Sequence, residues 1–212
     1  MILYGNSLSP YVRKVLAFAA EKGIALDLQA AGMGGGPPEF KLASPFGKMP
    51  GFKDGDFLIS DSTAIITYLD AIQPEPNLIP LEARARARTI WYEEFADTIV
   101  TACAGKVFFN RVVAPRFMGR EGDLAAAAEA QKTELPPLLD YLEKVIPASG
   151  FLVEDRITLA DLAVASPFVN LAHCDCVVDP QTHPKTAAYL ARILARPSYA
   201  AMVAQEKAAL AA

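Results

Sequence analysis

Hydrophobic and polar positions follow two different patterns along the chain. The first 80 residues alternate short apolar runs, typical of strands, with helical segments, whereas the later residues have apolar positions at helical spacing. The change falls just after residues 73–77, Gln-Pro-Glu-Pro-Asn, which are rich in helix and strand breakers. The pattern therefore predicts two domains, residues 1–76 and residues 82–212.

The first domain is predicted to be an α/β unit with the element order βαβαββα. Proline at position 10 suits the first position of a helix, and Gly23 suits its end. Asp54-Gly55 predicts the turn of a hairpin. The expected strands are 2–4, 24–28 and the two halves of 52–59, and the expected helices are 10–22, 39–43 and one that begins near residue 62.

The second domain is predicted to be all-helical. Thr158 and Asp161 have the spacing of a capping box, with Asp161 in the place usually held by Glu, so they are more typical of a helix start than of catalysis. Pro136-Pro137 is expected to interrupt or kink a helix. The expected helices are 82–112, 123–146, one that begins after Thr158, 184–195 and 199–210, with a loop at 114–122.

Composition excludes several classes of function. The chain has 212 residues, 52% of them hydrophobic, and a net charge of −4 without a Lys/Arg run, which argues against nucleic acid or an anionic membrane as partner. Apolar stretches are too short to span a bilayer, and Met1-Ile2-Leu3-Tyr4 has a strand pattern rather than that of a secretory leader. The three cysteines form no Cys-x-x-Cys motif and no zinc pattern, so we expect reduced cytoplasmic thiols.

Two segments, Gly47-Lys48-Met49-Pro50 and Asp61-Ser62, together suggest a site for a small peptide. If the Met49-Pro50 bond is cis, the Met49 amide and carbonyl face outward and can pair with an extended peptide. Asp61-Ser62 precedes a helix whose free amides attract carboxylates, while Asp61 can face an ammonium group. The simpler alternatives are a proline that begins a strand and an ordinary helix cap.

Ser9 is the residue predicted to do chemistry. It precedes Pro10 at a helix start, where a cap alone is the simpler explanation, but a hydroxyl can accept from the helix and still donate a proton. If the small peptide carries an alkyl thiol, the chemistry of Ser9 would be to hold that thiol ionised. Doing so near neutral pH requires lowering the pKa of the thiol by about two units, or about 2.7 kcal/mol. One hydrogen bond to a charged group supplies about 1.5–3 kcal/mol and a helix dipole up to ~1 kcal/mol, so one hydroxyl is sufficient.

With these residues, the chain resembles the cytosolic glutathione S-transferases over essentially its whole length. The resemblance is to the serine type, with bacterial-like motifs. The order and spacing of the motifs carry the resemblance, because each motif alone is weak. They are Ser9-Pro10-Tyr11-Val12-Arg13-Lys14-Val15, Glu21-Lys22-Gly23, Ser44-Pro45-Phe46-Gly47-Lys48-Met49-Pro50, Asp61-Ser62-Thr63-Ala64-Ile65, Thr158-Leu159-Ala160-Asp161 and Arg196-Pro197-Ser198-Tyr199.

The resemblance implies a thioredoxin-like first domain, an all-α second domain, glutathione as co-substrate without a metal, and a homodimer. It places the thiol-activating hydroxyl at Ser9, with Tyr4 as a runner-up that more often belongs to the core. The residues implied to bind glutathione are Lys48, Met49, Pro50, Asp61 and Ser62, with Met49 on the cysteinyl backbone and Asp61 and Ser62 on the γ-glutamyl group.

The sequence departs from the family where several serine-type classes carry a basic residue over the glycyl carboxylate. This chain has Gly34-Gly35-Gly36-Pro37-Pro38 there, so Lys41 or Lys48 is expected to bind that carboxylate, or the end is bound loosely, or another thiol is preferred. An electrophile pocket is expected between the domains. Its candidate walls, which could equally be core residues, are Leu8, Tyr11, Val107, Phe108 and Arg111.

The leading functional prediction is an enzyme that holds glutathione as a thiolate through Ser9 and adds it to a small hydrophobic electrophile. Glutathione-dependent isomerisation, dehalogenation or peroxide reduction would use the same thiol site. A hypothesis of another class is a non-catalytic ligand-binding or assembly module, because a fold does not determine a function.

Overall fold

The computed structural model describes residues 1–32 and 35–211, and it divides into two compact units, Met1–Ile79 and Pro80–Ala212. The first unit is a small α/β layer structure, and the second is made of helices. This confirms the predicted fold class, a thioredoxin-like unit followed by an all-helical one.

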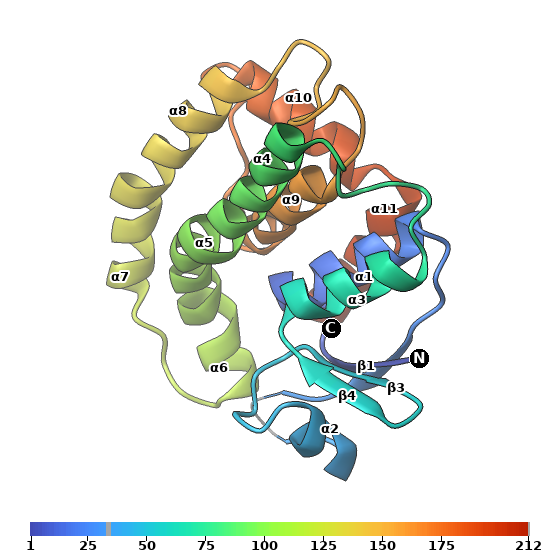
Figure 1. Ribbon diagram of the computed structural model, residues 1–212. Helices are drawn as coiled ribbons and strands as arrows, with labels where there is room; N and C mark the ends of the chain where they lie inside the picture. The colour runs from blue at the N-terminus through green and yellow to red at the C-terminus, as the bar shows by residue number, and fades with distance from the viewer. Residues whose placement is uncertain (33–34, 212) are drawn as a thin grey trace. The chain divides into compact units, whose positions relative to one another are not determined.

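The first unit has the predicted order βαβαββα. Figure 1 shows α1 and α3 side by side on one face of its sheet and α2 next to the other face. Its elements are β1 (Ile2–Gly5), α1 (Pro10–Glu21), β2 (Asp27–Ala30), α2 (Pro38–Ala43), β3 (Gly51–Asp54), β4 (Phe57–Ser60) and α3 (Ser62–Ile72).

The sheet has the strand order β2-β1-β3-β4, with β1 parallel to β2 and the other two pairings antiparallel. Tyr4 pairs with Gly51, and Gly51 pairs with Ser60. These three residues therefore lie in one row across neighbouring strands, which are about 4.7–4.9 Å apart. As a result, the end of β1, the start of β3 and the end of β4 meet at one end of the sheet.

Strand β2 begins three residues later than predicted, because the end of α1 uses the preceding residues. Gly23 has φ of +71°, its amide bonds the Ala20 carbonyl at 3.1 Å, and the Ile24 amide bonds the Ala19 carbonyl at 2.8 Å. Together these two hydrogen bonds form a Schellman motif. It ties Ile24 to the helix, so pairing with β1 starts only at Asp27.

The β3–β4 hairpin is present, with its turn centred one residue beyond the predicted Asp54-Gly55. Asp54 pairs with Phe57, which leaves Gly55 and Asp56 as the two loop residues. Gly55 has φ of +58°, the left-handed conformation that a tight hairpin turn requires.

The second unit contains helical segments of both α and π geometry. Its elements are α4 (Ala83–Glu94), η1 (Phe95–Val100), α5 (Thr101–Phe108), η2 (Phe109–Val113), α6 (Ala114–Phe117), α7 (Leu124–Glu129), η3 (Ala130–Glu134), α8 (Leu135–Val145), α9 (Leu159–Ala172), α10 (Pro184–Leu194) and α11 (Pro197–Ala211), where η marks a π-helical segment.

One expectation for this unit needs correction. The long helix predicted to end at 112 continues to Phe117, so the first part of the predicted loop is helical. The interruption predicted within the segment 123–146 is present, because the π-helical turn η3 directly precedes α8, whose first turn contains Pro136-Pro137. A proline has no amide to donate to the carbonyl four residues earlier, and its ring clashes with that carbonyl, which for these prolines lies in η3.

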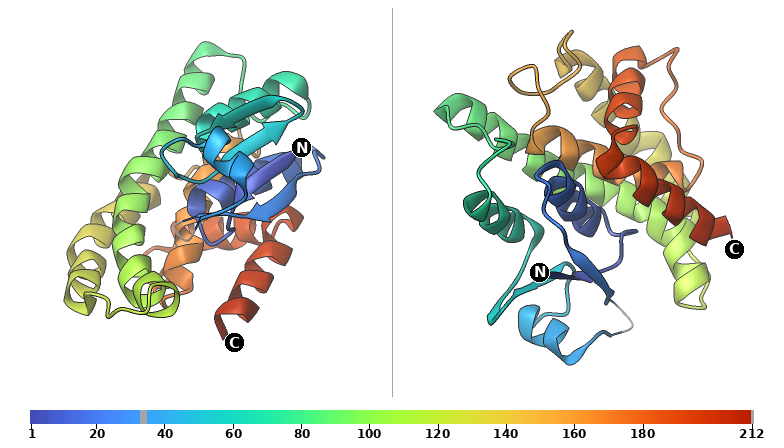
Figure 2. Two further views of the ribbon diagram at one scale, coloured as in Figure 1. Left: turned by 90° about the horizontal axis from the view of Figure 1, so that it is seen from below. Right: turned by 90° about the vertical axis from the view of Figure 1, so that its right-hand side faces the viewer.

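Helix α9 forms the centre of the second unit. Every residue from Leu159 to Leu171 is buried, and the helix contacts α4, α5 and α10. Figure 2 shows these helices around it. A helix that is apolar on all sides is expected to be enclosed by its neighbours in this way.

The predicted capping box at the start of α9 is present. Asp161 Oδ2 accepts hydrogen bonds from the Thr158 amide at 2.9 Å and from the Thr158 hydroxyl at 3.2 Å, while Oδ1 accepts from the Leu152 amide at 2.9 Å. Burial raises the pKa of the Asp161 carboxyl to about 6, although these hydrogen bonds act in the opposite direction.

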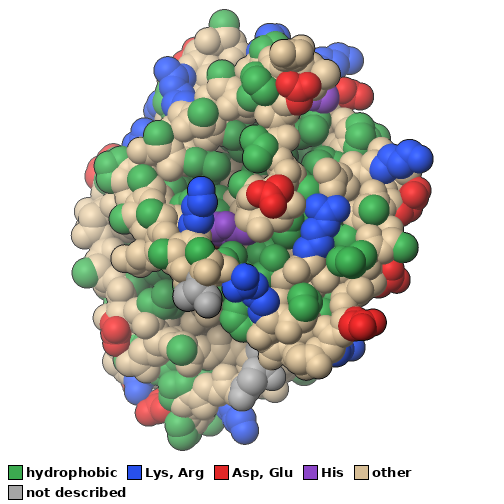
Figure 3. Space-filling view, turned by 180° about the vertical axis from the view of Figure 1, so that it is seen from behind, with side chains coloured by type: hydrophobic (Ala, Val, Ile, Leu, Met, Phe, Trp, Pro, Cys, Tyr) green, Lys and Arg blue, Asp and Glu red, His purple; other side chains and the backbone are tan. Residues whose placement is uncertain are grey.

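Within residues 1–32 and 35–211, no helix is both long and apolar enough to cross a membrane. The face of the molecule in Figure 3 carries Lys and Arg side chains interspersed with Asp and Glu. Charges of both signs are therefore mixed on this face.

A buried ammonium group fixes the last residues of the first unit. Lys22 Nζ donates to the carbonyls of Gln73 at 2.7 Å, Pro74 at 3.1 Å and Pro76 at 2.9 Å, and it lies 2.8 Å from Asp70 Oδ1. Its side chain is fully buried. One cation thus joins the end of α1 to the segment that follows α3.

We expect Lys22→Met to lower the free energy of unfolding of the first unit by about 3–5 kcal/mol, because it leaves a carboxylate and three carbonyls without their donor. Urea denaturation measures this change. The control is Lys53→Met, which removes a partly exposed ion pair at 3.9 Å to Glu39 and should cost about 0–1 kcal/mol. Equal effects of the two substitutions would contradict the structural role of Lys22.

The raised pKa of Asp161 predicts a pH dependence of stability. The folded state binds the proton more tightly than the unfolded chain, so this group stabilises the fold below its ordinary pKa and the contribution is lost as pH rises through about 6. Relative to Asp161→Asn, the wild type should gain free energy of unfolding between pH 7 and pH 4, measured by urea denaturation. A loss of free energy of unfolding between pH 7 and pH 4, relative to Asp161→Asn, would mean that the hydrogen bonds to the carboxylate outweigh its burial.

Candidate functional site

The three segments predicted to bind a ligand in the first unit meet at one end of the sheet. The row Tyr4–Gly51–Ser60 contains the first residue of β3, the last residue of β4 and the residue before the end of β1. Residues 6–9 leave β1, residues 49–50 enter β3 and residues 61–62 leave β4 at that level. Residues far apart in sequence are thus brought to one place by strand register.

Ser9 lies at the N-cap position of α1 in a hydrogen-bonded turn. Its amide donates to the Asn6 carbonyl at 2.9 Å, and its own carbonyl accepts from the Arg13 amide at 2.9 Å. Contrary to our expectation, its hydroxyl makes no capping hydrogen bond, and it has no partner among the described residues. Ser9 is partly exposed. Both its donor and its acceptor capacity are therefore available to a ligand.

The loop between α2 and β3 is held by an internal hydrogen bond. The buried Ser44 hydroxyl donates to the Lys48 carbonyl at 2.6 Å, and the Gly47 amide donates to the Ser44 carbonyl at 2.9 Å. The Met49-Pro50 peptide bond is cis. Neither the amide nor the carbonyl of Met49 has a hydrogen-bond partner in the part of the chain that the structure describes.

Gly5 lies between this loop and the start of α1. A Cβ atom built on Gly5 would lie 2.5 Å from a methyl group of Val12 and 3.5 Å from Met49 Cβ. The backbone at the end of β1 therefore contacts both segments closely. This contact makes the Met49 loop a direct neighbour of the turn that carries Ser9.

Asp61 caps the start of α3 with one of its two carboxylate oxygens. Its Oδ1 caps the helix by accepting from the Thr63 amide at 2.9 Å and the Ala64 amide at 3.1 Å, while Oδ2 has no partner among residues 1–32 and 35–211. Its φ of +84° lies in a region that residues other than glycine rarely adopt. Such strain is typical of functional positions. The neighbouring Ser62 is 2% exposed.

Tyr4, the alternative hydroxyl, belongs to the core of the first unit. It is 1% exposed and packs with Phe40 and Ala43. Burial, with smaller contributions from Glu39 and Asp27, raises the pKa of its hydroxyl. The side chain is therefore enclosed, which favours Ser9.

Lys41 and Lys48 are exposed and form no ion pair with any described residue. Both therefore remain open to a carboxylate. The glycine segment 34–36 is only partly described: Gly34 lies outside the described residues, while Gly35 and Gly36 are exposed.

The five predicted wall residues of the electrophile pocket have different environments. Leu8 and Tyr11 are partly exposed beside Ser9 in the first unit. Val107 is fully buried and Phe108 is 6% exposed on α5 of the second unit, where the Phe108 ring lies 6.4 Å from the His173 ring. The last two side chains are thus largely buried rather than open to a ligand.

Arg111 is held by residues of the second unit. Its guanidinium donates to Gln131 Oε1 at 2.7 Å, to Cys176 Sγ at 3.1 Å and to the Cys174 carbonyl at 3.2 Å. It therefore fixes the segment that follows α9, and nothing in this arrangement directs it toward an electrophile.

The cysteines are unsuitable as nucleophiles. Cys103, Cys174 and Cys176 are free and buried. Burial raises the pKa of Cys103 to about 11 and that of Cys174 to about 12, and it also raises the pKa of Cys176 against the opposing charge of Arg111. Thiols of this kind stay protonated near neutral pH. The part of the chain that the structure describes contains no cluster of acidic, His or Cys residues able to hold a metal.

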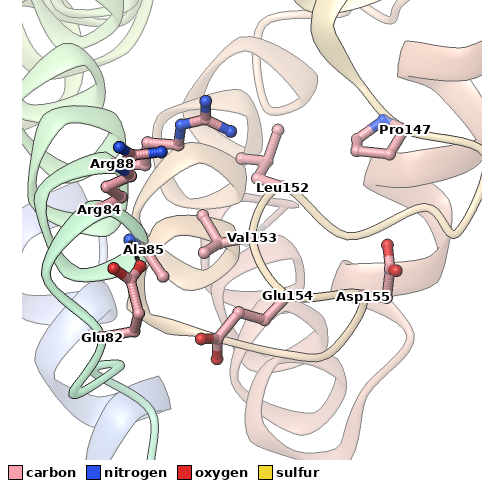
Figure 4. A pocket seen from close by; sticks show the side chains of 9 residues that line it. All are labelled: Glu82, Arg84, Ala85, Arg88, Pro147, Leu152, Val153, Glu154 and Asp155. Atoms are coloured by element: carbon pink, nitrogen blue, oxygen red, sulfur yellow. Dashed lines mark hydrogen bonds between the residues drawn. The ribbon is translucent and has the colours of Figure 1, made fainter.

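A pocket of about 360 Å³ in the second unit contains none of the predicted site residues (Figure 4). It lies between the start of α4 and the segment 147–155, and it carries both arginine and carboxylate side chains. One of these carboxylates, Glu82, stabilises the start of α4, because it accepts from the Ala85 amide at 2.8 Å, and backbone hydrogen bonds lower its pKa. We assign no ligand to this pocket.

Sequence reasoning missed two residues that shape the site. Asn6 accepts from the Leu8 amide through its side chain at 2.9 Å, and Ser44 holds the Met49 loop. For Asn6 a signal was present, because Asn often accepts a hydrogen bond from the amide two residues later. The Ser44 bond depends on the tertiary course of its loop, which local sequence does not indicate.

Comparison with known proteins identifies the family. Residues 3–77 match the model of the glutathione S-transferase N-terminal domain, and residues 109–206 match that of the C-terminal domain. A glutathione S-transferase of Hyoscyamus muticus is 31% identical over 205 residues, covering 94% of this chain and 95% of the relative. The human theta-1 enzyme is 30% identical, covering 90% of this chain and 81% of the relative.

Solved structures agree with this assignment. Human glutathione S-transferase T1-1 in its apo form has 27% sequence identity and a TM-score of 0.81, and the match covers 97% of this chain and 87% of that one. Glutathione S-transferase III in apo form has 28% identity and a TM-score of 0.79, covering 96% and 95% of the two chains. With both domain models matched in order, the chain belongs to the glutathione S-transferase family of enzymes.

Proposed function

We propose that the site at the end of the sheet binds glutathione, holds its sulfur as a thiolate through Ser9, and adds that sulfur to a small hydrophobic electrophile. The observation that carries the proposal is the meeting of three segments whose polar groups are unpaired. These are the Ser9 hydroxyl, the Met49 peptide groups and Asp61 Oδ2, none of which has a partner in the described chain.

The Ser9 hydroxyl is suited to stabilise a thiolate. A free hydroxyl at the N-terminus of the 12-residue helix α1 can donate one hydrogen bond to the sulfur, and the helix dipole adds a favourable field. The thiol proton leaves to solvent as the ligand binds. The sulfur then attacks an electrophilic carbon with its lone pair, and the leaving group departs with the electron pair of the bond that breaks.

The remaining polar groups match the rest of the tripeptide. Met49 offers a backbone donor and acceptor for the cysteinyl residue, beside Pro50, as an added strand would require. Asp61 Oδ2 suits the γ-glutamyl ammonium, and the first turn of α3 at Ser62 suits the neighbouring carboxylate. Lys48, with Lys41 as the alternative, is our candidate for the glycyl carboxylate because both are exposed.

Leu8 and Tyr11 are our candidates for contact with the electrophile, since both are partly exposed and flank Ser9 in sequence. An isomerase, dehalogenase or peroxidase would use the same thiolate and differ in the electrophile. A non-catalytic binding module would bind glutathione without lowering its pKa. The titration described below separates this last alternative from the enzyme.

We also propose a homodimer and a cytoplasmic location. Phe46 is 90% exposed, and burial of so large an apolar side chain against a second copy would remove it from water.

The three free cysteines are typical of a reducing compartment. The division into a first domain of residues 1–76 and a second domain of residues 82–212 remains our proposal.

We expect Ser9→Ala to return the pKa of bound glutathione toward the ordinary thiol value near 8.5, a rise of about two units. The measurement is the ultraviolet absorbance of the thiolate as a function of pH in the complex. Since the thiolate is the nucleophile, kcat/KM near neutral pH should fall about 10–100-fold with it. The same thiol pKa in Ser9→Ala and in the wild type would refute the role of Ser9.

Asp61→Asn separates the two roles of this side chain. The amide oxygen can still cap α3, so the melting temperature should change little, but the negative charge is lost. We expect KM for glutathione to rise at least about tenfold, because a charge-assisted hydrogen bond contributes about 1.5–3 kcal/mol. Asp56→Asn, on the exposed hairpin turn, is the matched control. An unchanged KM in Asp61→Asn would remove Asp61 from the site.

A further inference from the structure

We propose that Asn6 is a positioning residue that fixes the direction in which Ser9 presents its hydroxyl to the glutathione sulfur. The inference rests on the proposed function, because it concerns the same sulfur site. It assigns a role to a residue that makes its contacts with the turn and that we do not place in contact with the substrate.

Asn6 closes the turn between β1 and α1 with two hydrogen bonds. Its side-chain Oδ1 accepts from the Leu8 amide at 2.9 Å, and its backbone carbonyl accepts from the Ser9 amide at 2.9 Å. Only the oxygen of a carboxamide can accept from an N–H group, so the Leu8 amide also fixes which way the Asn6 amide faces. The turn is an Asx turn, in which the side chain replaces a backbone acceptor.

These bonds matter because the Ser9 side chain is not anchored by itself. A serine at an N-cap usually bonds an amide of the first turn, which fixes its χ1 angle. Ser9 has no such bond, so its backbone determines where the hydroxyl can point. From the strand side, the Ser9 amide is held by the Asn6 backbone carbonyl, and the neighbouring Leu8 amide is held by the Asn6 side chain. From the helix side, the Ser9 carbonyl is held by the Arg13 amide.

The position of Asn6 makes its effect separable from packing. Asn6 is exposed, whereas the preceding Gly5 is buried against Val12 and Met49. Removing the Asn6 carboxamide therefore leaves the core intact and loosens the turn. Ser7, in the same turn, is partly exposed and makes no hydrogen bond with a described residue, which makes it a matched control.

The test compares Asn6→Ala, Asn6→Ser and Ser7→Ala in the full chain, with glutathione as the ligand. We expect Asn6→Ala to raise the pKa of the bound thiol by about one unit and to lower kcat/KM below that pKa about tenfold. KM for glutathione should stay within about twofold, because the peptide contacts lie elsewhere. Asn6→Ser retains an acceptor oxygen for the Leu8 amide and should recover most of the loss. Ser7→Ala should match the wild type.

A double-mutant cycle tests whether Asn6 acts through Ser9. In a Ser9→Ala background, Asn6→Ala should cause no further rise in the thiol pKa, since the hydroxyl that it positions is gone. An additional rise of the same size in that background would overturn the inference, because Asn6 would then act on the sulfur independently.

The outcomes distinguish this inference from the function on which it rests. If Ser9→Ala leaves the thiol pKa unchanged, the proposed thiolate mechanism fails. If Ser9→Ala raises the pKa while Asn6→Ala behaves as Ser7→Ala does, only the role of Asn6 is refuted. If Asn6→Ala does not fold, Asn6→Gln takes its place, because the longer side chain does not form the turn that Asn forms with the amide two residues later. A rise of about one unit in the thiol pKa then supports the inference, and a thiol pKa within about 0.3 units of the wild type overturns it.

Discussion

Strand register at Tyr4, Gly51 and Ser60 is the constraint on which the site depends. It sets the end of β1, the start of β3 and the end of β4 at one level, so three loops remote in sequence share one end of the sheet. A slip by one residue would invert every side chain of a strand, which would move the buried Phe52 to the opposite face. The hydrophobic core of the first unit therefore also fixes where these three loops lie.

At that end of the sheet, Asp61 and Ser9 occupy helix-cap positions and still have polar atoms without a partner among the described residues. Asp61 caps α3 with one carboxylate oxygen and keeps the other unpaired among the described residues, in a backbone conformation unusual for its residue type. Ser9 occupies a cap position without making the cap bond, and the turn is closed by Asn6. The Ser9 hydroxyl and Asp61 Oδ2, which could have bonded amides of the first helical turn, therefore remain available for a ligand.

Much of the fold could be predicted from sequence because local signals agreed with the tertiary structure. Proline at the start of α1, the capping box at Thr158 and Asp161, and the hairpin around Gly55 each depend on nearby residues alone. The predicted start of β2 was wrong, because the hydrogen bonds at Gly23 and Ile24 tie that segment to the end of α1. The predicted end of the long helix at residue 112 was also wrong, because the helix continues to Phe117. Arg111 shows the same limit at the level of side chains, because its partners are 20 to 65 residues away.

The central claim, that the three loops form one glutathione site, can be tested by following the backbone amide resonances of the chain during a glutathione titration. The account predicts that the largest shifts fall in residues 6–11, 47–51 and 60–64 and follow a single binding curve, because these segments share one end of the sheet. Shifts confined to one of these segments, or centred on the pocket at residues 82–88 and 147–155, would contradict it.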